Sequence, residues 1–191
     1  MSDLKQNKPK GALVAFLGPL GTFSHVAVDQ YFGVDAQKHS VATIDDVFAE
    51  VEAGNAQFGV VPVENSTEGA GNNTQDCLVD TSLQIIAELV IPIEHNFLMQ
   101  QGASTASIKR IVSHRQSLAQ CRAWLAEHFP QVDKVEVASN AEAARLASVD
   151  PHTAAIAGLR AADLFSLQVL HARIQDQQNN CTRFLVLAKD P

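Results

Sequence analysis

The stretch Ala12-Leu13-Val14-Ala15-Phe16-Leu17, followed by Gly18-Pro19-Leu20-Gly21, decides the fold class. Six apolar residues in an unbroken run predict a buried strand, which the glycines and the proline end. Ser24 follows as a helix cap, with a helix expected to about Tyr31. A buried strand, a turn and a helix in this order indicate an α/β protein.

The next elements continue the alternation. Thr43, with Asp46 three residues later, is typical of a helix N-terminus, and Gly54 marks the end of that helix. The apolar run Phe58–Val63 is the following buried strand.

The second half of the chain repeats this order. Its expected elements are a strand at Arg110–Val112, a helix from about Ser117 to His128, a strand at Val135–Ala138, a capping box at Ser139–Glu142 and a strand at Ala154–Ala157. A shift of 96 residues sets Val41–Thr43 on Val137–Ser139, and a shift of 97 sets Val14 on Ile111. The repeated order predicts two similar α/β lobes.

Two further strand-like runs lie between these halves, at Leu83–Val90 and Ile93–Met99, and a third lies near the C-terminus, at Phe184–Leu187. The last run needs a sheet to join, and we expect it to return to the first lobe. The chain would then cross between the lobes twice, through hinges near Ile93–Phe97 and His171–Ile174. The predicted domains are a flexible N-terminus at 1–10, lobe 1 at 11–93 plus 174–191, and lobe 2 at 94–173.

The composition excludes several classes of partner. The 191 residues include 14 Lys+Arg and 21 Asp+Glu, a formal net charge of −7, without a basic stripe to neutralise phosphates, so we expect no nucleic-acid partner. The polar stretch 1–10 is unlike a signal peptide, and no apolar run reaches the roughly 18 residues needed to span a bilayer. We therefore expect a cytoplasmic protein without membrane contact. Cys77, Cys121 and Cys181 form no CxxC pair and predict free thiols and no metal site.

Four polar segments adjoin the predicted strands, at Gly18–Ser24, Pro62–Gly71, Ser113–Gln120 and Asn179–Arg183. Ligands of open α/β sheets bind outside the carboxyl ends of the strands, so we expect these segments around one central cleft. An acidic protein that binds an acidic ligand needs a few cations focused in that cleft, which draws attention to single arginines.

Each segment also has a purely structural interpretation. Gly18–Ser24 either offers backbone N–H groups to a carboxylate or forms an ordinary tight turn. Glu64, Asn65 and Ser66 either converge on a ligand or form a turn in which Asn65 or Ser66 caps a helix.

The other two segments offer hydrogen-bonding groups and a cation. If a helix begins near Ser117, then Ser113 and Gln120 both face the cleft with a hydroxyl and an amide. His114 lacks a carboxylate or thiol partner at suggestive spacing, and we interpret it as a structural histidine. Arg183, directly before a strand, suits bidentate carboxylate recognition, or else lies in a solvated loop.

Four motifs, in this order, resemble the prephenate dehydratase family: GPLGTFS (18–24), PVENSTEGAGNNTQDCL (62–78), SHRQSLAQC (113–121) and IQDQQNNCTRFLV (174–186). The resemblance implies a fold like that of type II periplasmic binding proteins and a homodimer. It also implies a carbon–oxygen lyase of L-phenylalanine biosynthesis that uses no cofactor and converts prephenate to phenylpyruvate, carbon dioxide and water. Carried over by motif, Thr182 is the proton donor, and the substrate-binding residues are Glu64, Asn65, Ser66, Ser113, Gln120 and Arg183.

The chain departs from the family pattern at Arg115, Gly71 and Cys181, where proline, valine and threonine are common. Many relatives continue into an ACT regulatory domain that binds phenylalanine, whereas this sequence ends at Pro191, so we expect no ACT domain. Three alternatives stay open: an arogenate dehydratase, a non-aromatising prephenate decarboxylase, and a non-catalytic module that binds a small acid.

Overall fold

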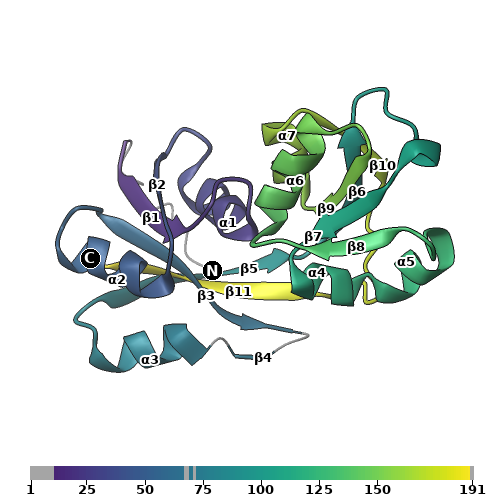
Figure 1. Cartoon of the computed structure of the whole chain (residues 1–191). Helices are drawn as coiled ribbons and strands as arrows, with labels where there is room; N and C mark the ends of the chain where they lie inside the picture. The colour runs from purple at the N-terminus through teal and green to yellow at the C-terminus, as the bar shows by residue number, and fades with distance from the viewer. Residues whose placement is uncertain (1–10, 67–68, 71, 190–191) are drawn as a thin grey trace, which may run out of the picture. The chain divides into compact units, whose positions relative to one another are not determined.

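A computed structural model describes residues 11–66, 69–70 and 72–189, which form two compact α/β units (Figure 1). Unit 1 contains the chain up to Gly18, Ser24–Ile91 and the chain from Thr182 onward, and unit 2 contains Pro19–Phe23 and Pro92–Cys181. The chain thus leaves unit 1 after Ile91 and returns to it after Cys181. The sequence alone predicts these two boundaries after residue 93 and before residue 174. The flexible N-terminus predicted at 1–10 and the departure at Gly71 lie outside the described residues.

Unit 1 is built on a mixed sheet. Its strands, in order of pairing, are β2 (Gln37–Val41), β1 (Leu13–Leu17), β3 (Phe58–Asn65), β11 (Cys181–Ala188) and β5 (Gln84–Pro92), and β4 (Gly69–Ala70) pairs with β3. β1 runs parallel to β2 and β3, and β11 runs antiparallel to β3. The strand nearest the C-terminus therefore lies inside the sheet, while β5 forms an edge.

Three helices belong to this sheet: α1 (Phe23–Phe32), α2 (Ile44–Glu52) and α3 (Asn72–Asp80). Thr43 caps α2 as predicted, because its hydroxyl accepts from the Asp46 N–H at 3.1 Å while the Asp46 carboxylate accepts from the Thr43 N–H at 3.1 Å. Gly59 of β3 lets α2 approach closely: a Cβ there would lie 3.0 Å from Val47 Cγ1 and 3.1 Å from Val51 Cγ2.

Unit 2 has a second mixed sheet. Its strands, in order of pairing, are β10 (Leu167–His171), β6 (Asn96–Gln100), β9 (Thr153–Ala157), β7 (Arg110–Ser113) and β8 (Asp133–Glu136). Its helices are α4 (Arg115–Gln120), α5 (Arg122–His128), α6 (Asn140–Val149), α7 (Leu159–Leu164) and the short 3-10 helix η1 (Thr105–Ser107). β7 runs parallel to β8 and β9, whereas β6 runs antiparallel to β9 and β10.

The central strand β9 is buried along its whole length because helices cover both faces of the sheet. Ala155 and Ala157 pack in the core cluster that includes the alanines of α6 and α7, while Ala154 and Ile156 pack in the cluster that includes Leu125 of α5. Successive side chains of a strand point to opposite faces, so a strand covered on both sides is apolar throughout.

The strand registers confirm the shifts found in the sequence. The paired residues are Val14 with Lys38 and Phe58 in unit 1, and Ile111 with Lys134 and Ala154 in unit 2. Corresponding residues differ by 97 in the first strand and by 96 in its two neighbours. The predicted fold class, two similar α/β lobes, is therefore confirmed.

The helix expected from Ser117 was placed wrongly, since α4 begins two residues earlier, at Arg115, and Cys121 separates it from α5. The cap is His114, whose Nδ1 accepts from the Gln116 N–H at 3.3 Å. The histidine is thus structural, as interpreted from the sequence.

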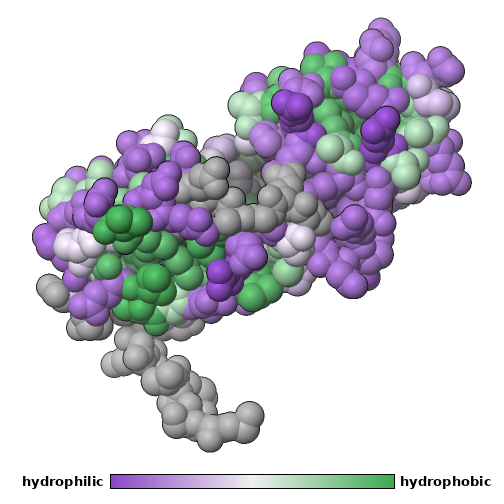
Figure 2. Space-filling view, turned by 90° about the horizontal axis from the view of Figure 1, so that it is seen from below, coloured by the Kyte–Doolittle hydropathy of each residue, from purple (hydrophilic) through white to green (hydrophobic). Residues whose placement is uncertain are grey.

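Unit 1 also exposes large apolar side chains on α3 and on its edge strand β5. Val79 is 81% exposed, and Ile85 and Val90 are each 53% exposed. Figure 2 shows apolar side chains gathered on one face of this unit, at the left of the view. Within the described part of the chain, no helix is long and apolar enough to cross a membrane.

Candidate active site

Strands β3 and β11 bring four of the predicted site residues together in unit 1. The pairs are Thr182 with Asn65, Arg183 with Glu64, and Phe184 with Pro62. The register shift leaves Val63 as the extra residue of a β-bulge, a feature that redirects the side chains following it. Pro62 lacks a backbone N–H and is tolerated beside this interruption of the ladder.

Thr182 and Asn65 are joined by a hydrogen bond, in which Asn65 Nδ2 donates to Thr182 Oγ1 at 2.7 Å. A hydroxyl has a single hydrogen, so accepting this bond directs the Thr182 proton away from Asn65. Among the described residues, no hydrogen-bond acceptor for that proton is found. This geometry leaves the Thr182 hydroxyl able to donate to another group.

Arg183 lies between two carboxylates. Its guanidinium is 3.1 Å from Glu64 Oε2 and 3.4 Å from Glu88 Oε2. All three side chains are more than 40% exposed, so each ion pair contributes only about 0–1 kcal/mol. A ligand carboxylate that bonds the guanidinium in bidentate fashion can compete with such pairs. Glu88 was missed from the sequence. It lies on β5, a neighbour of β11 in the sheet, and is 95 residues away from Arg183 along the chain.

Ser66, the remaining candidate of this segment, lies exposed in the turn after β3. Residues 67, 68 and 71 of the same motif lie outside the described part of the chain.

In unit 2, Asn140 gathers the polar groups that follow β7. Its Oδ1 accepts from Ser113 Oγ at 2.9 Å, Ser117 Oγ at 2.9 Å and the His114 N–H at 3.2 Å. Ser113 is fully buried, and its hydroxyl also lies 2.7 Å from the Ile156 carbonyl oxygen. Ser113 thus belongs to a network that ties the end of β7 to the starts of α4 and α6. Asn140 was missed, although it directly follows the predicted helix cap Ser139.

The cap at Ser139 is present in half of the expected form. Its hydroxyl accepts from the Glu142 N–H at 3.0 Å. The Glu142 carboxylate instead binds Arg145, with hydrogen bonds of 2.8 and 2.7 Å, and this pairing lowers the pKa of Glu142.

Gln120 ends α4 beside a buried histidine. Its Oε1 is 2.7 Å from His95 Nε2 and accepts from Asn180 Nδ2 at 3.0 Å. His95 is 1% exposed, and burial lowers the pKa of its ring below the ordinary 6.5 even though the bond to Gln120 opposes the shift. The ring is therefore neutral at physiological pH.

The Gly18–Ser24 segment has the geometry of a tight turn. Thr22 Oγ1 donates to the Pro19 carbonyl oxygen at 2.9 Å, and Gly21 has a φ of +92°, which side-chain-bearing residues rarely adopt. Helix α1 begins at Phe23, so Ser24, expected as its cap, lies within the helix.

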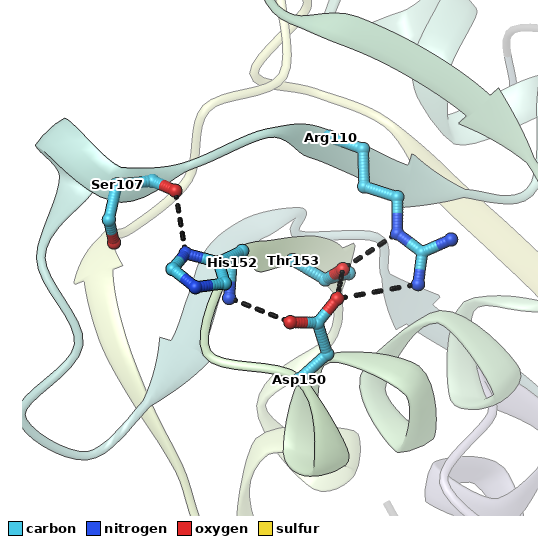
Figure 3. A network of polar contacts seen from close by, with 5 residues as sticks. All are labelled: Ser107, Arg110, Asp150, His152 and Thr153. Carbon is cyan, nitrogen blue, oxygen red and sulfur yellow. Dashed lines mark hydrogen bonds and ion pairs between the residues drawn. The ribbon is translucent and has the colours of Figure 1, made fainter.

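A separate polar network lies at the opposite, amino ends of β7 and β9 (Figure 3). Thr153 Oγ1 donates to Asp150 Oδ2 at 2.6 Å and accepts from Arg110 Nε at 2.7 Å. The Asp150 Oδ1 accepts from the His152 N–H at 2.9 Å, and the His152 ring contacts the Ser107 carbonyl oxygen. This network joins the first residues of β7 and β9 to each other, whereas the candidate residue Ser113 lies at the other end of β7. No group of three or more His, Cys, Asp or Glu able to hold a metal ion occurs in the described residues.

Polar clusters follow β3 in unit 1 and β7 in unit 2, at the carboxyl ends of strands with parallel neighbours, which is where open α/β sheets bind small polar molecules. The chain belongs to the prephenate dehydratase family, since the family model described as "Prephenate dehydratase" matches residues 14–191.

Known relatives agree with this membership. A bifunctional chorismate mutase/prephenate dehydratase of Pseudomonas aeruginosa is 48% identical over 174 residues, which cover 91% of this chain and 48% of that protein. The chain thus spans about half the length of the curated relatives it matches. The crystal structure of a prephenate dehydratase from Arthrobacter aurescens in complex with L-Phe has a TM-score of 0.85 at 34% identity, over 94% of this chain and 61% of that one. GqqA, described as a novel type of quorum quenching acylase, has a TM-score of 0.83 at 28% identity, over 94% and 64%.

Proposed function

We propose that this chain converts prephenate to phenylpyruvate, carbon dioxide and water, as a step of L-phenylalanine biosynthesis. Family membership supports the reaction class, and the Asn65–Thr182 hydrogen bond is the observation that carries the assignment of the donor.

The chemistry requires such a donor. As the bond between the ring and its carboxylate breaks, the electron pair moves through the diene and expels the ring hydroxyl. Hydroxide is a poor leaving group, and a positioned proton donor typically contributes about 10² to 10⁴ in rate. Threonine is a weak acid, so Thr182 either transfers its proton late, in concert with cleavage of the carbon–oxygen bond, or relays a proton from a neighbouring group. The hydroxyl leaves as water, and the Thr182 oxygen regains a proton from that neighbour or from solvent.

Substrate binding would use the cation of unit 1. Arg183 has the geometry to hold the side-chain carboxylate of prephenate in place of Glu64 or Glu88.

The donor can be tested by a turnover assay with prephenate and arogenate, read from the ultraviolet spectrum of the product. Phenylpyruvate formation that disappears in Thr182→Val supports the proposal. A product that retains the ring hydroxyl would indicate a non-aromatising decarboxylase, and tight binding without turnover would indicate a binding module. Acylase activity, the activity named for GqqA, together with no reaction of prephenate would also overturn the assignment.

We further propose a cytoplasmic homodimer. The support is the edge strand β5, with Ile85 and Val90 half exposed, because long apolar sheet edges favour association. Analytical ultracentrifugation should find a dimer that Val90→Lys weakens, and a wild-type monomer at micromolar concentration would count against it.

A further inference from the structure

His95 stands at the centre of a buried polar cluster in unit 2. Its ring lies 5.9 Å from that of Phe23 in an edge-on contact, and its Nε2 lies 2.7 Å from Gln120 Oε1. Its backbone N–H donates to Gln175 Oε1 at 2.9 Å, and its carbonyl oxygen accepts from the Ile174 N–H at 2.8 Å. Backbone and ring contacts together fix the position of this histidine.

The same packing prevents the ring from shifting. A Cβ at Gly158 would lie 3.1 Å from Cε1 of Phe23, so the Phe23 ring packs directly against Gly158 as well as against the His95 ring. On the Gln120 side, the Asp176 N–H donates to the Gln120 carbonyl oxygen at 2.8 Å. The imidazole and the helix end that it contacts are therefore both held.

The hydrogen bonds determine which ring nitrogen of His95 carries the proton. Gln120 Oε1 already accepts from Asn180 Nδ2 at 3.0 Å, so it can approach His95 Nε2 to 2.7 Å only if that nitrogen also donates. A neutral imidazole has one N–H, which leaves Nδ1 as a bare acceptor. His95 Nδ1 is buried and has no hydrogen-bond partner among the described residues, as this tautomer requires of an unprotonated nitrogen.

We propose that His95 is a positioning residue that fixes the polarity of the Gln120 amide, so that Gln120 presents N–H donors to an acceptor oxygen of the substrate. This inference rests on the proposed function, in which Gln120 binds the substrate. An amide rotated by 180° would set its nitrogen against the Asn180 donor and would require the other His95 tautomer, whose N–H at the buried Nδ1 has no hydrogen-bond partner among the described residues. Gln120 therefore recognises a carboxylate or keto oxygen and disfavours an ammonium or N–H group at that position.

Two replacements of His95 separate positioning from packing. His95→Gln keeps an N–H donor near the place of Nε2, whereas His95→Asn places its amide near the place of Nδ1. We expect His95→Asn and Gln120→Ala each to raise KM for prephenate about 10-fold with a smaller change in kcat, since each removes one directed hydrogen bond to a charged substrate. His95→Gln should stay within about 3-fold of wild type, and His95→Asn/Gln120→Ala should be no worse than Gln120→Ala. His152→Asn, in the same unit but in the network of Figure 3, is the matched control and should leave KM unchanged.

Equal losses in the Gln and Asn variants, or additive losses in the double variant, would overturn the inference. Nitrogen-15 NMR of the full-length wild type provides a readout that does not depend on turnover. Its ring shifts should show His95 protonated at Nε2 and bare at Nδ1 at neutral pH, and the opposite tautomer would refute the inference. If the wild type shows this tautomer but does not turn over prephenate, the proposed function is refuted, while the inferred orientation of the Gln120 amide still holds.

Discussion

Replacing Thr182 by valine removes the hydroxyl while nearly preserving the volume of the side chain. If Thr182 supplies the leaving-group proton, kcat for prephenate should fall about 10² to 10⁴-fold, with little change in KM because Arg183 remains. The variant also loses the hydrogen bond accepted from Asn65, worth about 1 kcal/mol. In a chain of this size that corresponds to a fall in Tm of about 2–4 °C, so the variant remains folded in the assay.

The structure predicts how Asn65 contributes to the same step. Its 2.7 Å bond to Thr182 is a neutral, half-buried hydrogen bond, worth about 0.5–1.5 kcal/mol. If all of that energy acts on the barrier, Asn65→Ala lowers kcat about 2- to 13-fold. Because Asn65 acts through the Thr182 hydroxyl, the same change in a Thr182→Val background should lower kcat no further.

The four proteins to compare are the wild type, Thr182→Val, Asn65→Ala and the double variant, which together form a double-mutant cycle. Their kcat values are measured from steady-state formation of phenylpyruvate, followed by its ultraviolet absorbance. Thr153→Val is the matched control, since it removes a hydroxyl from the network of Figure 3 and should lower Tm without changing kcat. A Thr182→Val enzyme within threefold of the wild-type kcat, or independent losses at the two positions, would refute the reasoning.

Three further predictions concern stability and thiol reactivity. Gly59→Ala should cost about 1–3 kcal/mol in thermal unfolding, because the added methyl meets two valines of α2; an unchanged Tm would contradict it. Hydrogen bonds from Thr153 and the His152 N–H hold the pKa of Asp150 below its ordinary 3.8. The ionised carboxylate therefore stabilises the folded protein fully above pH 3.8, and this contribution is lost as the pH falls through the folded-state pKa. Asp150→Asn should therefore lower Tm at neutral pH, and the difference from wild type should shrink as the pH falls below 3.8; parallel pH profiles would argue against this. Burial, followed by the charge of Asp176, raises the pKa of Cys121 to about 12, so mass spectrometry at pH 8 should find it alkylated only after unfolding, and rapid labelling of the native protein would disprove it.

Features encoded in a few neighbouring residues could be predicted from the sequence. Thr43 and Asp46 cap α2 because both partners lie within one turn, and the apolar runs at β1, β3 and β9 indicate strands directly. The start of α4 was missed because histidine is an uncommon cap, whereas Ser117 belongs to the usual set.

Features that depend on distant parts of the chain could not be predicted. Glu88 reaches Arg183 from 95 residues away, and His95 meets Gln120 across 25 residues. The motifs supplied Gln120 and Arg183, yet the groups that contact them, His95 and Glu88, come from segments distant in the sequence, and no local pattern specifies these contacts. The short helix α7 and the edge strand β10 lacked signals for the same reason, since tertiary contacts rather than local propensity stabilise them.

The position of β11 inside the first sheet has a consequence for biosynthesis. As the ribosome extends the chain, residues 92–181 emerge as one continuous stretch and can begin to fold, while β5 and one edge of β3 have to wait for β11, which follows much later in the chain. The candidate donor Thr182 is the second residue of β11, 117 residues beyond Asn65. Any nascent fragment that lacks β11 should be catalytically silent and should expose an unpaired sheet edge, which chaperones can bind until β11 has been synthesised.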